Sequence, residues 1–222
     1  MLQPSTLKFL KDLKKNNNKP WFEKHRPAYE RARKDFSDFI QDILNAHVKK
    51  DPNLKDLTAK NCLYRINRDI RFSKDKTPYK TNFAASLDKG GKQSGLAGYY
   101  FQLEPGRSFF GGGIWMPPTD RLKKIRQEID YCFDEFNGIL NNKKFKLLYP
   151  ELYKGESVQL SRVPQGFEKE NPAAEYLRFK SWLVLKELTD EDVLAPGLLK
   201  KTLSGFEALQ PFLQFLNRAA EE

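Results

Sequence analysis

Residues 97–115 read AGYYFQLEPGRSFFGGGIW, and this stretch predicts the centre of the fold. Two runs rich in aromatic residues, 97–103 and 108–115, flank the sequence Glu104-Pro105-Gly106-Arg107. A Pro-Gly pair at the centre of four residues is typical of a type II turn between antiparallel strands. Further short apolar runs at 62–66, 82–87 and 181–188 have the composition of strands. The sequence therefore predicts an antiparallel sheet of four or more strands.

Helical patterns lie on both sides of these runs. Apolar residues recur with helical period over residues 29–49, again over 119–136 after Pro117-Pro118, and over 197–217. A shorter amphipathic segment begins near Ser5. Because helices precede and follow the run of strands, we predict an α+β fold whose N-terminal, middle and C-terminal helices pack against the sheet.

The composition is that of a folded, water-soluble chain. With 222 residues, 39% of them hydrophobic, it has the size of one domain, and we predict a single domain over residues 1–222. The charged fraction of 31% leaves no run near the roughly 20 apolar residues that a membrane helix needs, so no membrane partner is expected. The first residues have no apolar export signal, and two isolated cysteines do not make a disulfide framework. These features predict a cytoplasmic protein and say nothing about oligomeric state.

Positive charge is concentrated in the first part of the chain. Residues 1–92 hold 22 lysines and arginines against 11 aspartates and glutamates, whereas residues 93–222 hold 17 against 18. A positive surface attracts anions and binds polyanions without sequence specificity. The asymmetry therefore indicates an anionic ligand or polyanion as a possible partner.

The most unusual segment is residues 65–80, RINRDIRFSKDKTPYK. The stretch from Lys60 to Lys80 contains seven basic residues, and its acidic residues are Asp69 and Asp75. Guanidinium groups hold phosphate or carboxylate in a planar fork, and ammonium groups add point charges. We predict an anion-binding site for phosphate, nucleotide or nucleic acid, and its ligand-binding residues are Arg65, Arg68, Arg71, Lys76 and Lys80.

Two other interpretations of the same segment stay open. In an enzyme acting on a phosphorylated or carboxylated small molecule, the arginines would stabilise developing negative charge, with Asp69 as the candidate base and Tyr79 as the candidate proton donor. In a structural protein, the aspartates would pair with the arginines in a buried ion-pair network. The sequence does not decide whether the protein is an enzyme.

Motifs for metals and cofactors are not found in the sequence. His25 and His47 are isolated, and no cluster of cysteine and histidine has the spacing of zinc ligands. Gly111-Gly112-Gly113 lacks the lysine and serine or threonine spacing of a phosphate-binding loop. We therefore expect neither a metal ion nor a cofactor.

Aromatic residues of the predicted hairpin alternate between its two faces, so one set could stack nucleic-acid bases beside the basic segment. These aromatic residues are Tyr99, Tyr100, Phe101, Phe109, Phe110 and Trp115, and one of the two faces must belong to the core. No RNA-recognition sequence of the RRM type is present, so helices covering both faces of the sheet are the expected arrangement.

The motif also resembles that of a known family. Arg65, Arg68-Asp69, Arg71-Phe72, Asp75-Lys76 and Pro78-Tyr79-Lys80 together match the pattern RxxRDxRFxxDKxPYK. This pattern is similar to the one that marks an uncharacterised family of bacterial proteins with fungal relatives, whose function is unknown. The resemblance extends over nearly the whole chain and implies that residues 65–80 are a shared site, but it implies no substrate.

Overall fold

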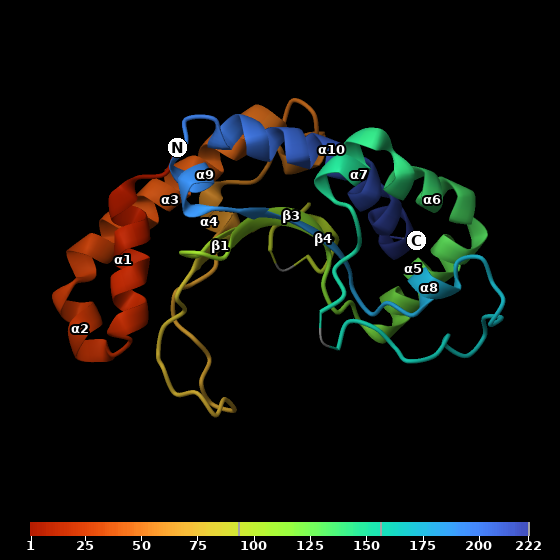
Figure 1. Ribbon diagram of the computed structural model, residues 1–222, viewed down its shortest axis with the longest axis horizontal. Helices are drawn as coiled ribbons and strands as arrows, with labels where there is room; N and C mark the ends of the chain where they lie inside the picture. The colour runs from red at the N-terminus through yellow and green to blue at the C-terminus, as the bar shows by residue number, and fades with distance from the viewer. Residues whose placement is uncertain (93, 156, 222) are drawn as a thin grey trace. The chain divides into compact units, whose positions relative to one another are not determined.

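The computed structural model describes residues 1–92, 94–155 and 157–221 (Figure 1). The described chain divides into two compact units. Unit 1 contains Met1–Lys92, Tyr100–Phe110 and Glu187–Ser204, and unit 2 contains Gln93–Tyr99, Gly111–Lys186 and Gly205–Glu222. The prediction of a single domain over residues 1–222 stays a prediction.

Four strands form one antiparallel sheet in the order β1-β2-β3-β4: β1 (Phe83–Leu87), β2 (Gly98–Leu103), β3 (Ser108–Ile114) and β4 (Trp182–Leu188). The sequence predicted each of these strands to within one residue. Gly106, at φ 75°, occupies the left-handed position of the turn between β2 and β3, and the amide of Arg107 donates to the carbonyl of Glu104 at 2.9 Å. The predicted α+β class is confirmed.

The run at residues 62–66 is not a strand. Cys62 ends α4 (Ala59–Cys62), a single turn whose N-cap Thr58 forms a capping box with Asn61. Leu63 then makes one isolated antiparallel bridge with Ala85 of β1, and the amide of Tyr64 donates to the carbonyl of Ala84 at 2.9 Å. The prediction of a regular strand at this place was wrong, because the chain pairs with β1 for two residues only.

Unit 1 opens with three helices: α1 (Pro4–Lys15), α2 (Lys19–Lys24) and α3 (Arg26–His47). Asn18 caps α2 by accepting the amide of Trp21 at 3.0 Å, and a proline stands in the first turn of each helix, where its missing N–H is not needed. The buried face of α3 packs on the sheet, with Phe36 against Phe83 and Phe39 against Phe101. One face of the unit 1 part of the sheet is therefore covered by α3.

In unit 2 the helix predicted over residues 119–136 is two helices, α5 (Thr119–Tyr131) and α6 (Phe133–Asn141). Cys132 stands between them with φ −113° and ψ 39°, outside the helical region. Arg218 bonds to Glu128 of α5 at 2.8 Å and to Glu135 of α6 at 2.8 Å, so one guanidinium holds the two helices at their junction. The break therefore lies inside the range predicted as one helix.

The remaining elements are short except the last helix. They are the 3₁₀ turn Pro52–Leu54, α7 (Lys143–Leu148), α8 (Ala174–Leu177), α9 (Asp190–Leu194) and α10 (Leu198–Glu221). Pro211 lies inside α10, and the apolar residues around it, such as Phe212 and Phe215, are buried. None of the helices in the described part of the chain has the length and apolar character needed to cross a membrane.

Candidate functional site

Residues 65–80 form a narrow hairpin-like loop that leaves unit 1 beside β1 (Figure 1). Its two sides pair at the base, where Asn67 and Tyr79 make an antiparallel bridge. The amide of Arg68 donates to the carbonyl of Pro78 at 2.9 Å, and the amide of Lys80 donates to the carbonyl of Ile66 at 2.8 Å. We call residues 65–80 the basic hairpin.

The base of the basic hairpin is held by the N-terminal helices. The side-chain amide of Asn17, in the turn between α1 and α2, donates to the carbonyl of Tyr79 at 2.9 Å and accepts its amide at 3.1 Å. The Tyr79 ring, which is 6% exposed, stacks on Phe22 of α2 with centroids 4.0 Å apart. Tyr79 is therefore part of the core that fixes the hairpin.

Arg68 points into the hairpin and makes most of its internal bonds. Its Nη1 bonds to the Asp75 carboxylate and to the hydroxyl of Thr77, and also reaches the Thr77 carbonyl at 3.2 Å. The backbone N–H of Thr77 and the Arg68 guanidinium lower the pKa of Asp75 to about 2. The Asp75 side chain is 60% exposed, so this part of the motif is an ion pair within the hairpin and not a buried one.

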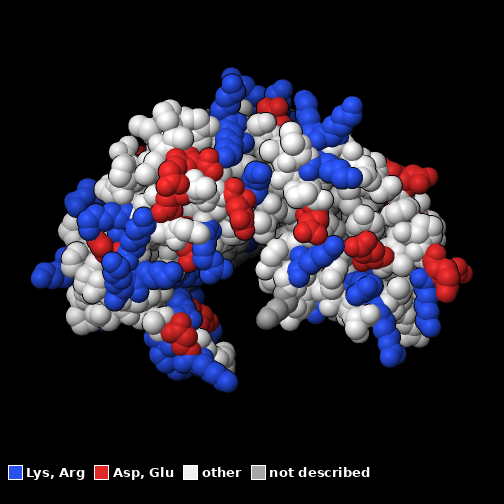
Figure 2. Space-filling view, viewed as in Figure 1, with Lys and Arg blue, Asp and Glu red and all other residues white. Residues whose placement is uncertain are grey.

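The tip of the hairpin is exposed. Arg71 bonds to Asp69 through Nε at 3.0 Å and through Nη2 at 2.7 Å, and this bidentate pair lowers the pKa of Asp69. Phe72 is 95% exposed, with the Arg71 guanidinium 5.8 Å from its ring centroid. Figure 2 shows the tip covered mostly by lysine and arginine atoms, with acidic atoms between them. The exposed basic residues there are Arg71, Lys74 and Lys76.

Lys80 and Arg65 lie at the base of the hairpin and have different surroundings. The ammonium group of Lys80 is 5.3 Å from the ring centroid of Tyr64. Burial, and then the nearby positive charge of Arg65, lower the pKa of Lys80. Within the described residues, neither cation has a carboxylate at ion-pair distance. Two like charges thus lie near each other, and the nearby Asp69 carboxylate, which bonds to Arg71, interacts with Arg65 without forming an ion pair with it.

Beside these cations, three partly exposed rings form a row on the face of the sheet opposite α3. Tyr64 lies 6.4 Å from Tyr100 of β2, and Tyr100 stacks on Phe109 of β3 at 5.5 Å. Alternation along β2 places Tyr100 and Gln102 on this face and the buried Phe101 against α3. The expectation that helices cover both faces does not hold here, and we call Tyr64, Tyr100 and Phe109 the aromatic row.

Polar side chains continue the row along β2. The Tyr100 hydroxyl donates to Gln102 at 3.0 Å, Gln102 donates to Glu104 at 2.9 Å, and the Thr81 hydroxyl donates to Glu104 at 3.2 Å. On β1 the Ser86 hydroxyl donates to Asp88 at 2.6 Å, and burial raises the pKa of Asp88 to about 6. These contacts fix the orientation of the row.

The structure thus separates the predicted site residues into groups. Arg65 and Lys80 lie together next to the aromatic row, and Arg71 and Lys76 lie on the exposed loop, where the Lys76 ammonium donates to the Ile70 carbonyl at 3.0 Å. Arg68 points into the hairpin. Sequence reasoning missed Tyr64. Its place in the row follows from the pairing of Leu63 with Ala85 of β1, which no local pattern in the sequence reports.

Residues 5–215 match the model of a family described as conserved hypothetical protein (DUF2461). The chain belongs to this family. The match covers both units and includes the whole basic hairpin, in agreement with the resemblance seen in the sequence. Neither the curated proteins nor the solved structures give a match.

Proposed function

We propose that this protein binds a polyanion, and that single-stranded nucleic acid is the ligand that its geometry supports best. The observation that carries the proposal is the aromatic row ending at two cations, Lys80 and Arg65, that make no ion pair within the described residues. Proteins that bind single strands combine rings on which bases stack with basic groups that follow the phosphates. Both elements stand side by side on one face of the sheet in unit 1.

The basic hairpin extends this surface. Arg71, Lys74 and Lys76 are exposed at its tip, and Phe72 offers an uncovered ring beside the Arg71 guanidinium. If the bases of a nucleotide strand stacked on the aromatic row, its phosphates would contact the cations at the base of the hairpin. Phosphates further along the strand would contact the basic residues of the tip. A cytoplasmic location, as the sequence predicts, is part of this proposal.

The surroundings of Asp69 and Tyr79 give less support to the enzyme alternative. A general base near neutral pH is favoured by a raised pKa, whereas the pair with Arg71 lowers the pKa of Asp69. The Tyr79 ring is covered by Phe22, and its backbone is held by Asn17. The catalytic roles of Asp69 and Tyr79 stay predictions, and none of the contacts described above favours them.

The test is fluorescence anisotropy of a labelled 12-nucleotide single strand with the full chain, over a series of salt concentrations. We expect binding that weakens steeply with salt, because cations on the protein release counterions from the strand. Tyr100→Leu and Phe109→Leu should each weaken binding by about 5- to 150-fold, since stacking contributes about 1–3 kcal/mol per base. Tyr153→Leu, a partly exposed tyrosine of unit 2, is the matched control and should bind like the parent.

A second pair of variants tests the cations. Removing Arg65 and Lys80 together, as Arg65→Gln with Lys80→Gln, should weaken binding and reduce its salt dependence. Lys143→Gln with Lys144→Gln removes the same charge from exposed positions of α7 and is the control. Equal losses in the two double variants, or salt-insensitive binding of the parent, would contradict the proposal.

A further inference from the structure

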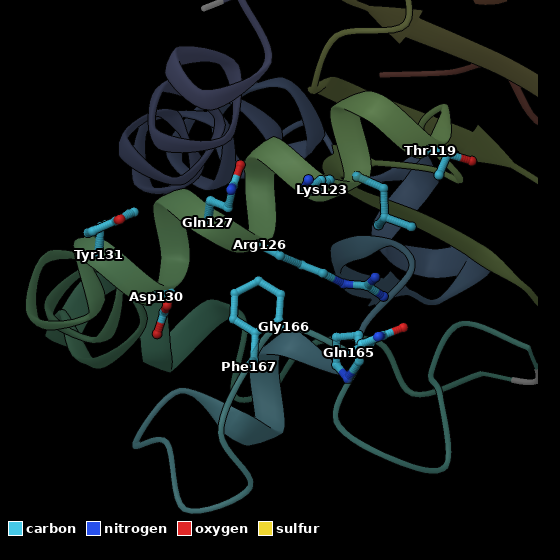
Figure 3. Close-up of a pocket in the computed structure, with 11 residues that line it drawn as sticks. Thr119, Lys123, Arg126, Gln127, Asp130, Tyr131, Gln165, Gly166 and Phe167 are labelled. Atoms are coloured by element: carbon cyan, nitrogen blue, oxygen red, sulfur yellow. The ribbon is translucent and has the colours of Figure 1, made fainter.

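Unit 2 contains a pocket of about 270 Å³ between α5 and the loop at residues 164–167 (Figure 3). One wall is the face of α5, and the loop forms the other wall. Apolar groups from Leu122, Pro164 and Phe167 lie beside polar groups in the lining. The polar lining residues are Thr119, Lys123, Arg126, Gln127, Asp130 and Gln165.

Arg126 is the unusual member of this pocket. Its side chain leaves α5 and runs past the Phe167 ring toward Gln165 (Figure 3), yet the residue is only 8% exposed. Nη2 donates to the carbonyl of Phe179 at 2.9 Å, and Nε is buried with no hydrogen-bond partner. Burial lowers the pKa of Arg126. An arginine so deeply buried is almost always paired with an anion.

No carboxylate of the described chain pairs with this guanidinium. The carboxylate in the pocket lining is that of Asp130, one turn further on α5, and it accepts a hydrogen bond from the side-chain amide of Asn171. Lys123, one turn earlier, adds a second positive charge to the lining. The pocket therefore holds a buried cation whose charge and Nε donor are both unsatisfied.

We propose that this pocket binds a small molecule through an anionic oxygen group, a carboxylate or a phosphate, that pairs with Arg126. An anion there would compensate the buried charge and accept from the guanidinium in a planar fork. The amides of Gln127 and Gln165 line the same space, and the apolar part of the ligand would lie against Leu122, Pro164 and Phe167. The inference rests on residues of unit 2 alone and is independent of the proposed nucleic-acid binding.

The first experiment measures thermal unfolding of the full chain at constant ionic strength with benzoate, phenyl phosphate, inorganic phosphate or the neutral benzamide. A ligand that binds only the folded state raises Tm with its concentration. We expect an increase with at least one of the anions and none with benzamide. Benzoate and phenyl phosphate distinguish a carboxylate from a phosphate site.

Arg126→Met removes the charge and keeps a side chain of similar length. In chloride its Tm should equal or exceed that of the parent, because the variant no longer buries an unpaired cation. The increase caused by anions should be lost. Arg162→Met removes the same charge from an exposed position of unit 2 and should keep the anion effect of the parent.

A second variant keeps the inference testable if Arg126→Met does not fold. Gln165→Glu places a carboxylate in the exposed loop facing the guanidinium, so it should raise Tm without anions and abolish the anion effect. The inference is overturned if no anion stabilises the parent, or if anions stabilise the parent and both pocket variants equally. The latter result would place the anions elsewhere on the protein.

Discussion

The basic hairpin and the Arg126 pocket use positive charge in opposite ways. The 16 residues of the hairpin contain three arginines and two aspartates. Two of the arginines, Arg68 and Arg71, are paired with those aspartates. Arg126 is a buried arginine of α5 that has no carboxylate at ion-pair distance in the described chain. A high density of charge in the sequence is therefore a poor guide to where charge is left uncompensated in the fold.

The largest expected effect concerns the support of the hairpin. Tyr79→Ala should lower the free energy of unfolding by about 3–5 kcal/mol, because it removes a buried ring from Phe22 and leaves a cavity. Tyr79→Phe keeps the ring and should change stability far less. Urea unfolding of both variants checks this, and a large loss in Tyr79→Phe would contradict it and give the hydroxyl a role.

The next largest effect is the pH dependence of stability caused by Asp88, which is buried, unlike the aspartates of the hairpin. Its pKa of about 6 in the fold lies above the ordinary value of 3.8, so the folded state binds more protons between pH 4 and 6 and loses stability as the pH rises through that range. Asp88→Asn removes this cost and should be more stable than the parent by about 3 kcal/mol at pH 7.

Unfolding of Asp88→Asn and of the parent from pH 3.5 to 8 gives the measurement. The difference should be small at pH 3.5 and should grow to its full size above pH 7. Asp69→Asn is the comparison, because the pKa of that carboxyl is lowered by Arg71 and any pH-dependent difference should have the opposite sign. A difference independent of pH would show that the Asp88 carboxyl does not titrate in this range.

A smaller effect is expected on the rate at which trypsin cleaves the hairpin, and it should differ between Arg68 and Arg71. Arg68→Gln loses the bonds to Asp75 and Thr77 that close the loop, so trypsin should cut after Lys74 and Lys76 faster than in the parent. Arg71→Gln loses only an exposed pair with Asp69 and should be cut at the parent rate. Equal rates in the two variants would remove the distinction between an internal and an exposed arginine.

Most elements of the fold followed from local sequence, and the exceptions have a common cause. Strands with alternating rings and helices with an apolar stripe were predicted because each pattern is complete within its own segment. The strand at 62–66 was wrong because pairing with β1 depends on where the chain turns away, which no local pattern reports. Cys132 likewise breaks a helix whose apolar period continues past it.

The candidate sites show the same limit. The sequence marked the basic hairpin because its charges are contiguous, but it could not show that Arg68 points inward while Arg65 and Lys80 lie beside Tyr64. Arg126 gave no signal, since one arginine on an amphipathic helix is ordinarily solvated. Its burial depends on the loop at residues 164–167, which is distant in sequence.

The two hydrogen bonds of Asn17 to Tyr79 also bear on the order of folding. They join a side chain to a backbone position 62 residues away, so forming them requires closure of a long loop before any stabilisation is gained. The Asn17 side-chain amide bonds to Tyr79 as the backbone of a neighbouring strand would. It has the position for these bonds only when α1 and α2 are formed. During synthesis these helices leave the ribosome before the hairpin, so the residue that fixes the base of the hairpin is made before the hairpin itself.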